Sequence, residues 1–243
     1  MAPDTVTGED DRTMVRGGPQ PIPRPPGTRP GHPAPWSTAS ASDLRVDTDR
    51  VRSAFSTIGP PVRSPREGVV TAGAAVLAPL YDHEGETYLV LTRRSSALRV
   101  HSGEVSFPGG RQDPGEDLVQ TARRESFEEI DLDPASVEIV GELDHLSTIS
   151  SNSFIVPYVG VLRERPLLIP SPAEVDAVLH VPLSELLRPD VYREEQWPIF
   201  GSDRSIFFFE LMGDTVWGAT AAMLRQLLGF ATGTLGRGEI AHE

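Results

Sequence analysis

The sequence predicts an α/β fold that carries an extended N-terminal arm. Segments of strand length, rich in β-branched and apolar residues, recur between positions 69 and 211. An acidic segment with helical periodicity interrupts them near residue 120, and a proline-rich stretch precedes them. We therefore expect three parts: a proline-rich arm with a short helix over residues 1–65, one folded domain over residues 66–230, and a C-terminal tail over residues 231–243.

The composition of the chain argues against several classes of function. A net charge of −13 over 243 residues disfavours indiscriminate binding to nucleic acid. The chain has no cysteine, so it holds no disulfide framework, thiolate zinc site or cysteine nucleophile. No apolar run approaches about 18 residues, which predicts no membrane span. The acidic N-terminus also lacks the apolar core of a signal peptide, so we expect a cytoplasmic protein.

Residues 1 to about 40 are rich in proline, glycine and arginine. Such a composition favours extended conformations and does not build a packed core. The simpler interpretation is a disordered tail. The alternative is an arm that lies along this subunit or along a partner, with Trp36 as its apolar anchor. In both cases we expect the arm to be dispensable for the function of the domain.

A short helix is predicted after the arm, from Ser40 to Phe55. Ser42 or Asp43 can cap its N-terminus, because their side-chain oxygens accept hydrogen bonds from free backbone N–H groups. Prolines at positions 60, 61 and 65 then form a linker to the domain. The apolar stripe of this helix would consist of Leu44, Val51 and Phe55.

Strands dominate the pattern of the domain, with a turn at residues 82–86 between the first two. We predict strands over residues 69–77, 87–92, 137–143 and 154–161, a short strand and helix over 178–187, a strand over 207–211 and a final helix over 217–228. The three phenylalanines at 207–209 could form an aromatic platform for a substrate, but ordinary core packing is the favoured interpretation. From residue 229 onwards we expect a loose tail.

A glycine-rich loop and the helix after it are the most distinctive part of the chain. Prolines and glycines between Pro108 and Gly115 predict a tight loop that exposes its backbone. The helix is expected from about Asp117 to Ile130. Its apolar side would consist of Leu118, Ala122 and Ile130, with Val119 and Phe127 nearby.

Three carboxylates project together from the other side of this helix: Glu125, Glu128 and Glu129. Like charges at spacings of three and four residues repel one another. They are tolerated where water solvates them or where they surround a cation. A solvated acidic face is the simpler interpretation of the carboxylates alone, and the glycine loop before them favours the cation.

The loop and the helix together fit a longer pattern of fixed spacing. It resembles the Nudix box, G-x5-E-x7-R-E-U-x-E-E-x-G-U, in which U is a bulky aliphatic residue. Two positions depart from the pattern. Ser126 replaces an aliphatic residue, and Asp131 replaces the final glycine at a helix end where a left-handed conformation is common. The matching positions are Gly110, Glu116, Arg124, Glu125, Glu128, Glu129 and Leu132.

Four arginines surround the approach to this loop and reverse the sign of an acidic chain: Arg93, Arg94, Arg99 and Arg111. They are either surface arginines paired with nearby acids or a site for phosphate groups, to which a guanidinium offers two parallel donors. Their segment resembles the motif L-L-T-x-R-[S/A]-x3-R-x3-G-x3-F-P-G-G of the coenzyme A pyrophosphatases in the Nudix superfamily. The matching positions are Leu91, Thr92, Arg94, Ser95, Arg99, Gly103, Phe107, Pro108, Gly109 and Gly110, with Val90 at the first position.

These resemblances imply a Nudix α/β/α sandwich with a mixed central sheet over about residues 70–228, and a bound Mg²⁺ or Mn²⁺. The implied metal ligands are Glu125, Glu128, Glu129 and Gly110. The implied catalytic residues are Glu125, Glu128, Glu129 and Arg124. The implied substrate-binding residues are Arg94, Arg99, Arg111, Gly109 and Gly110. Arg124 is expected to pair with a neighbouring carboxylate and to fix the loop against the helix, with Glu116 in an outer position.

The general base is left open among several candidates. Glu125 and Glu129 are favoured by their positions in the box. Glu174 lies in a segment that resembles the family and is an outlying candidate, although a plain surface glutamate explains it nearly as well. His145 is a further candidate, but a single loop histidine is more often structural.

The implied activity is hydrolysis of the pyrophosphate bond of coenzyme A, or of an acyl or oxidised form, to 3′,5′-ADP and 4′-phosphopantetheine or its derivative. One alternative is a Nudix hydrolase of ADP-ribose or a dinucleotide. Another is a catalytically silent Nudix domain that senses a nucleotide. The expected partner is a small molecule of the coenzyme A class rather than nucleic acid or a membrane. The resemblance also implies a homodimer, because many proteins of the superfamily are dimers.

Overall fold

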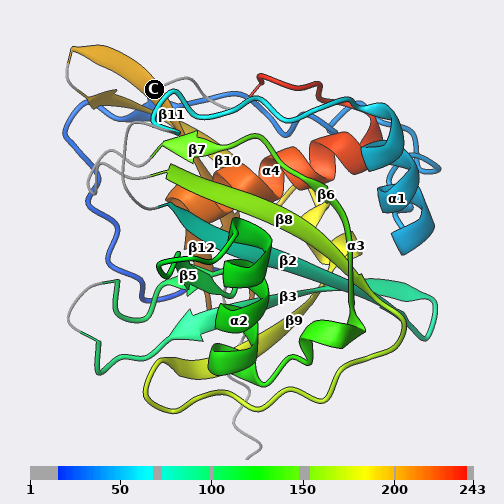
Figure 1. The fold of residues 1–243 in the computed structure, drawn as a ribbon. Coiled ribbons are helices and arrows are strands. Elements are labelled where there is room, and N and C mark those ends of the chain that lie inside the picture. Colours follow the sequence, from blue (N-terminus) through cyan, green and yellow to red (C-terminus); the bar gives the residue numbers. More distant parts are fainter. Residues whose placement is uncertain (1–15, 68–72, 99–100, 148–153, 200, 240–243) are drawn as a thin grey trace, which may run out of the picture.

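A mixed sheet of eight strands forms the centre of the computed structural model (Figure 1), which describes residues 16–67, 73–98, 101–147, 154–199 and 201–239. Its strands are β2 (Ala74–His83), β3 (Glu86–Arg94), β4 (Val105–Ser106), β5 (Gly109–Arg111), β6 (Val137–Glu142), β7 (Leu146–Ser147), β8 (Phe154–Leu162) and β9 (Val175–Pro182). The main path runs β4-β3-β2-β8-β6, while β5 pairs with β2, β7 with β8 and β9 with β3. β2 and β8 are parallel, which makes the sheet mixed as predicted.

The side chains of β2 divide the core between the two faces of this sheet. Ala75, Leu77 and Tyr81 share one apolar cluster with α2, whereas Ala78 and Leu80 share another with α1 and α4. Because successive strand residues point to opposite faces, a strand buried on both faces is apolar along its length. The helices on the two sides are α1 (Thr48–Thr57), α2 (Leu118–Ile130), α3 (Leu183–Leu186) and α4 (Gly218–Thr232), with a 3₁₀ turn η1 (Pro134–Ser136) after α2. The predicted α/β/α arrangement is confirmed.

A tight turn joins β2 to β3 at the predicted place. His83 pairs with Glu86, so only Glu84 and Gly85 lie between the strands. Both have positive φ, 51° and 80°. Two-residue turns of this kind match the right-handed twist of the strands that they connect. β2 therefore runs on to His83, farther than predicted, and positions 69–72 of the expected strand lie outside the described residues.

A second sheet has four strands, and the sequence predicted only the segment at residues 207–211. Its strands are β1 (Arg29–Pro30), β10 (Tyr192–Ile199), β11 (Ser202–Glu210) and β12 (Thr215–Trp217), in the order β1-β10-β11-β12. Phe207, Phe208 and Phe209 lie on β11 and are all buried. The interpretation of these three residues as core is therefore confirmed.

Residues 16–39 form an arm that packs along the second sheet, so the expectation of a disordered tail is wrong for them. The short strand β1 pairs with β10. Trp36 is only 2% exposed, its Nε1 donates to the carbonyl of Leu187 at 3.1 Å, and its ring stacks on Phe209 with centroids 6.2 Å apart. Trp36 is the apolar anchor of the alternative prediction, and the arm lies along its own subunit.

The first helix of the chain begins at Thr48, later than predicted. Asp47 is its N-cap and accepts a hydrogen bond from the backbone N–H of Arg50 at 2.8 Å. Ser42 and Asp43, the expected caps, lie in the turns before it. Two of the three predicted apolar positions, Val51 and Phe55, are buried in the helix.

The C-terminal segment is packed as far as residue 239, so the expected loose tail from residue 229 is wrong. α4 continues through Thr232 and ends on Gly233, whose φ of 73° is left-handed. Arg237 then forms an ion pair with the buried carboxylate of Asp144, with 3.0 Å between Nη1 and Oδ1. No helix in the described part of the chain, α4 included, is long and apolar enough to cross a membrane.

Candidate active site

Helix α2 carries the candidate carboxylates, and local hydrogen bonds fix its start. Asp117 accepts the backbone N–H of Gln120 at 2.8 Å, and the Gln120 side chain accepts the N–H of Asp117 at 3.0 Å. This reciprocal pair is a capping box. At the other end Asp131 is left-handed, with φ of 57°, which is the conformation that the sequence indicated for this position. The helix therefore spans the predicted range.

The sequence identified the buried side of α2 only in part. Ala122 and Ile130 are fully buried as predicted, but Phe127 is 50% exposed, so its assignment to the apolar side is wrong. Ser126 is buried instead, and its hydroxyl donates to the carbonyl of Ala122 at 2.7 Å. That local bond satisfies a polar side chain at a position where the box has an aliphatic residue. Glu129 lies on the same buried side.

Two glycines bring the loop backbone close to its neighbours. Gly109 has φ of 152°, and a Cβ there would lie 2.6 Å from the Cα of Val76 in β2. A Cβ on Gly110 would lie 2.5 Å from Oε1 of Glu125. Only glycine tolerates both the conformation at Gly109 and these distances. The absence of side chains therefore lets β5 pack between β2 and α2.

Glu129 is the most deeply buried carboxylate of the box. Its side chain is 3% exposed, Oε2 accepts the N–H of Gly109 at 3.1 Å, and Nη1 of Arg94 lies 3.6 Å from Oε1. Burial disfavours the charged form and raises the pKa of Glu129 to about 7, with a further increase from the charges of Glu125 and Glu174. The hydrogen bond from Gly109 and the charge of Arg94 lower this pKa, but each of these effects is smaller than that of burial. Glu129 can therefore hold or release a proton near neutral pH.

Arg124 joins the other carboxylates of the box into one network. Its Nε donates to Glu116 at 2.7 Å, and its Nη1 donates to Glu125 at 3.0 Å and to Glu128 at 2.9 Å. Its Nη2 donates to the backbone carbonyl of Arg111 at 3.0 Å. A guanidinium can serve several acceptors at once because its five N–H groups are fixed in a planar fork. The prediction that Arg124 pairs with carboxylates and fixes the loop against the helix is confirmed.

The carboxyl groups of this network differ in their pKa values and in their exposure. The hydrogen bond from Arg124 lowers the pKa of Glu116 to about 2. Burial raises the pKa of Glu125, and Arg124 offsets only part of that increase. The side chain of Glu128 is 56% exposed. Burial therefore disfavours ionisation of Glu125, while Arg124 favours the charged form of Glu116.

The chemistry of Glu125 and Glu129 fits a divalent cation. Burial raises the pKa of both carboxyls, and the charge of Glu174 raises both further. A cation beside them offsets this cost. Within the described ranges, no three histidine or acidic side chains already converge on a metal position. Glu128 is turned toward Arg124 instead. The three expected carboxylate ligands lie on α2, and the fourth expected ligand, Gly110, lies on β5, but they do not form a completed set.

The four predicted arginines have different surroundings. Arg94 lies beside the buried carboxylate described above. Arg93 makes a two-bond ion pair with Asp214, with Nε 2.8 Å from Oδ1 and Nη2 2.6 Å from Oδ2. Arg111 is exposed on β5. Arg99 lies outside the described residues. Arg93 therefore fits the interpretation of an arginine paired with an acid, and Arg94 lies next to the box.

The two outlying candidates for a general base have different positions. Glu174 is exposed, and its charge is close enough to Glu129 to raise the pKa of that carboxyl. His145 has a side chain that is 4% exposed and lies between Glu67, at 3.1 Å, and Glu142, at 3.3 Å. Its contacts on both sides agree with the structural interpretation of this histidine.

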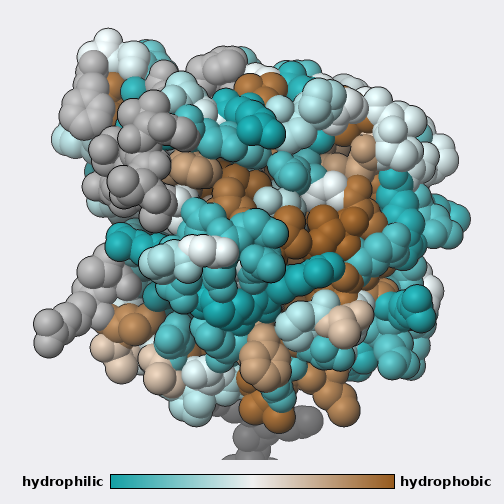
Figure 2. All heavy atoms as spheres, in the orientation of Figure 1, coloured by the Kyte–Doolittle hydropathy of each residue, from teal (hydrophilic) through white to brown (hydrophobic). Residues whose placement is uncertain are grey.

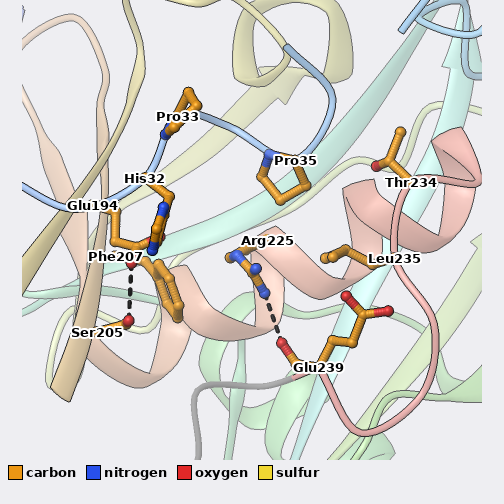
Figure 3. A pocket seen from close by; sticks show the side chains of 10 residues that line it. All are labelled: His32, Pro33, Pro35, Glu194, Ser205, Phe207, Arg225, Thr234, Leu235 and Glu239. Atoms are coloured by element: carbon orange, nitrogen blue, oxygen red, sulfur yellow. Dashed lines mark hydrogen bonds between the residues drawn. The ribbon is translucent and has the colours of Figure 1, made fainter. Parts of the chain in front are cut away.

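The surface over α2 is hydrophilic in the view of Figure 2, which has the orientation of Figure 1. A separate hollow of about 330 Å³ lies between the arm, the second sheet and α4 (Figure 3). Arg225 donates to the backbone carbonyl of Glu239 at its edge, at 2.8 Å. None of the candidate site residues contributes to it. Its lining consists of His32, Pro33, Pro35, Glu194, Ser205, Phe207, Arg225, Thr234, Leu235 and Glu239.

The family model described as NUDIX domain matches residues 71–200. The chain belongs to the Nudix family. The uncharacterized Nudix hydrolase NudL of Photorhabdus laumondii is 37% identical over 155 residues, which cover 63% of this chain and 82% of that protein. The chloroplastic Nudix hydrolase 22 of Arabidopsis thaliana is 39% identical over 160 residues, covering 62% of this chain and 52% of that protein. A solved MutT/nudix family protein from Enterococcus faecalis aligns with a TM-score of 0.44 and 14% identity over 74% of this chain and 73% of that one.

As a Nudix hydrolase, the chain is a pyrophosphohydrolase of nucleoside diphosphate derivatives.

Two residues near the Nudix site, Asp214 and Gln20, were not predicted from the sequence. Asp214 binds Arg93 across 121 positions of sequence, and Gln20 binds Asp214 across 194 positions. Neither residue belongs to a motif, and no local pattern indicates a contact between segments so far apart.

Proposed function

We propose that this Nudix hydrolase cleaves the pyrophosphate bond of coenzyme A, or of an acyl or oxidised form of it. The products are 3′,5′-ADP and 4′-phosphopantetheine or its derivative. Two features support the proposal. One is the arginine motif that runs from Val90 to Gly110, and the other is the 3.6 Å distance between Arg94 of that motif and Glu129 of the box.

The contact between Arg94 and Glu129 carries the argument, because it sets a phosphate-binding cation beside the carboxylate cluster. Among the described residues, the Arg94 side chain donates no hydrogen bond and has this one loose ion pair, whereas Arg93 is occupied by Asp214. The guanidinium of Arg94 therefore has donors left for the oxygens of a phosphate group.

We assign the binding of Mg²⁺ or Mn²⁺ to Glu125, Glu128, Glu129 and the backbone carbonyl of Gly110. Oxygen ligands of this kind suit both cations. When bound, such a cation neutralises pyrophosphate oxygens and lowers the pKa of a water molecule. Glu128 has a side chain that is 56% exposed, so it can leave Arg124 at little cost.

Among the residues of the chain, Glu129 is our choice for the proton acceptor, with Glu125 as the second candidate. Its position in the box favours it, and the N–H of Gly109 fixes Oε2 at 3.1 Å. Arg94 holds a phosphate oxygen of the substrate. The water oxygen then forms a bond to phosphorus, the bond from phosphorus to the bridging oxygen breaks, and the water proton passes to the carboxylate.

The decisive experiment is product analysis with a panel of substrates. The full chain is incubated with Mg²⁺ and coenzyme A, ADP-ribose or a dinucleotide in ¹⁸O-labelled water, and the products are identified by mass spectrometry. We expect 3′,5′-ADP and 4′-phosphopantetheine, with the label in one new phosphate end, and no turnover in chelator. Cleavage of ADP-ribose with coenzyme A untouched would reject the coenzyme A assignment. Turnover of no substrate would favour the silent nucleotide sensor.

The arginines provide a second test of substrate class. Arg94→Ala should raise KM by at least about tenfold, because a charged hydrogen bond to substrate is lost. Arg24→Ala is the matched control, since it removes an ion pair between the arm and Glu195 of β10. For Arg99→Ala, the motif predicts a larger increase in KM with coenzyme A than with its 3′-dephospho form. Equal increases would assign Arg99 to the pyrophosphate or to a structural role.

A further inference from the structure

The buried side chain of Gln20 connects the N-terminal arm to the segment between Val90 and Gly110 that carries the arginine motif. Its Nε2 donates to Oδ1 of Asp214 at 2.8 Å and to the backbone carbonyl of Gly103 at 3.3 Å, while its Oε1 accepts the N–H of Thr215 at 2.9 Å. Gln20 is 9% exposed, so these bonds are largely shielded from water. One carboxamide thus joins the arm, the second sheet and the loop after β3.

Asp214 is the centre of this contact. Its side chain is 4% exposed and is bound by both Arg93 and Gln20. The Asp214 carboxylate is buried while the Arg93 side chain is 37% exposed, so the carboxylate needs both partners to compensate its charge. Arg93 is the residue before Arg94 on β3. Any shift of Asp214 is therefore passed to the strand end that carries Arg94.

Gly103 provides a second path to the same arginine. Its N–H donates to the carbonyl of Arg94 at 3.2 Å, and the N–H of Arg94 donates to the carbonyl of Glu104 at 2.9 Å. Gly103 has φ of 70°, which suits the sharp return of the chain at this point. Gln20 binds the free carbonyl of Gly103, so the arm holds the backbone that pairs directly with Arg94.

We propose that Gln20 is a positioning residue for substrate binding. Through Asp214 and Gly103 it holds the end of β3 in the position from which Arg94 meets a phosphate group. The inference rests on the proposed role of Arg94, and it does not depend on which nucleoside diphosphate derivative is cleaved. It also changes the expectation for the arm, because a segment outside the catalytic domain then contributes to substrate affinity.

Gln20→Met tests the proposal, because methionine keeps the volume of glutamine and loses its hydrogen bonds. With whichever substrate the panel identifies, we expect KM to rise about five- to tenfold while kcat stays within about twofold, since a small displacement of a binding group weakens its contact. Arg24→Ala on the same arm should leave KM unchanged. Hydrogen exchange at the amides of Arg94 and Gly103 should become faster in Gln20→Met and not in the control.

Asp214→Asn supplies the second variant. It should raise KM similarly. The double variant with Gln20→Met should raise KM no more than the larger of the two single changes does, because both act through one contact.

A Gln20→Met protein with unchanged KM and unchanged exchange at Arg94 would reject the proposal. A lower melting temperature with the same KM would reduce Gln20 to a structural role. If Gln20→Met does not fold, an unchanged KM in Asp214→Asn rejects the proposal equally. If Arg94→Ala itself leaves KM unchanged, the role of Arg94 fails first, and the exchange measurement still reports whether Gln20 holds the strand.

Discussion

Glu129 and Glu116 belong to the same motif but occupy opposite electrostatic environments. Glu129 is buried against β5, and its pKa rises to about 7. Glu116 is bound by Arg124, and its pKa falls to about 2. The contrast shows that the motif supplies two kinds of carboxylate from one residue type. Glu129 has a pKa near neutral pH. Glu116 stays charged and, through Arg124, supports the loop.

The largest effect is expected from Glu129→Gln. This change removes the buried charge and the proton acceptor but keeps the shape, so the fold should persist while kcat falls by at least about a hundredfold. Steady-state kinetics and circular dichroism measure the two quantities. Glu138→Gln is the control, because among the described residues Glu138 pairs with Arg52 alone, on the exposed surface. Activity near the wild-type level in a folded Glu129→Gln protein would favour a solvated acidic face.

The pH dependence of stability should distinguish the two carboxylates in the presence of a chelator. Between about pH 4.5 and 7 the folded protein retains a proton on Glu129 that the unfolded chain has lost, so the free energy of unfolding falls as pH rises. The decrease attributable to Glu129 is on the order of 3 kcal/mol. Glu116 has the opposite sign, and its contribution is lost as pH falls from 4.5 toward 2. Urea denaturation at several pH values measures both slopes. An unchanged slope in Glu129→Gln between pH 4.5 and 7 would contradict the assignment.

Arg124→Lys should reduce kcat by about tenfold. Lysine keeps the charge but lacks the planar fork that serves Glu116, Glu125, Glu128 and the carbonyl of Arg111 together. We expect the effect to fall as the Mg²⁺ concentration increases, because the loosened carboxylates still bind a cation. A titration of rate against Mg²⁺ measures this. A rate that is unchanged at every concentration would show that the network does not position the cluster.

Glu116→Gln should cost less, about threefold in kcat. Glutamine can still accept hydrogen bonds from Arg124 and Thr121, and Glu116 lies away from the buried end of the cluster. The same kinetic assay applies, with Glu129→Gln measured alongside it. A loss as large as that of Glu129→Gln would remove the distinction between the two carboxylates and would make Glu116 part of the chemistry.

The smallest effect is expected from Phe127→Ser, on the exposed side of the same helix. A side chain that is 50% exposed has little burial to lose, so the free energy of unfolding should change by less than about 0.5 kcal/mol. Ser126→Ala, one position away, should cost more because it opens a small gap where the buried hydroxyl packs. Urea denaturation compares the two. A reversed order would mean that the helix lies on the domain differently.

Local chemistry explains why the Nudix helix could be predicted. Asp117 and Gln120 form a cap within four positions, and the left-handed end at Asp131 follows from a single residue. The neighbours Glu128 and Glu129 show where such reasoning stops. Both were predicted on one acidic side of the helix, yet one is 56% exposed and the other 3%. The difference arises from β5 and from Arg94, which are brought to the helix by the tertiary fold.

Strand β10 of the second sheet was not predicted because its sequence contains consecutive charged residues. β10 contains Glu194, which is 7% exposed and accepts hydrogen bonds from Gln196 at 2.6 Å and from Ser205 at 2.9 Å. In sequence, consecutive charged residues suggest a surface loop, because a buried carboxylate is costly without partners. The partner Ser205 comes from the adjacent strand and becomes a neighbour only when the two strands pair. Gln20 and Asp214 likewise become neighbours only when the arm packs against the second sheet.

The position of the arm determines when during translation this part of the fold can form. Trp36 leaves the ribosome long before Leu187, the residue that its indole contacts 151 positions later. The second sheet therefore gains its outermost strand only when most of the chain has been made. In the interval, the prolines between positions 19 and 35 protect the segment, because proline offers no N–H to the edge of another chain's sheet. This early segment is thus among the last to dock, and an incomplete chain exposes the surface that it covers.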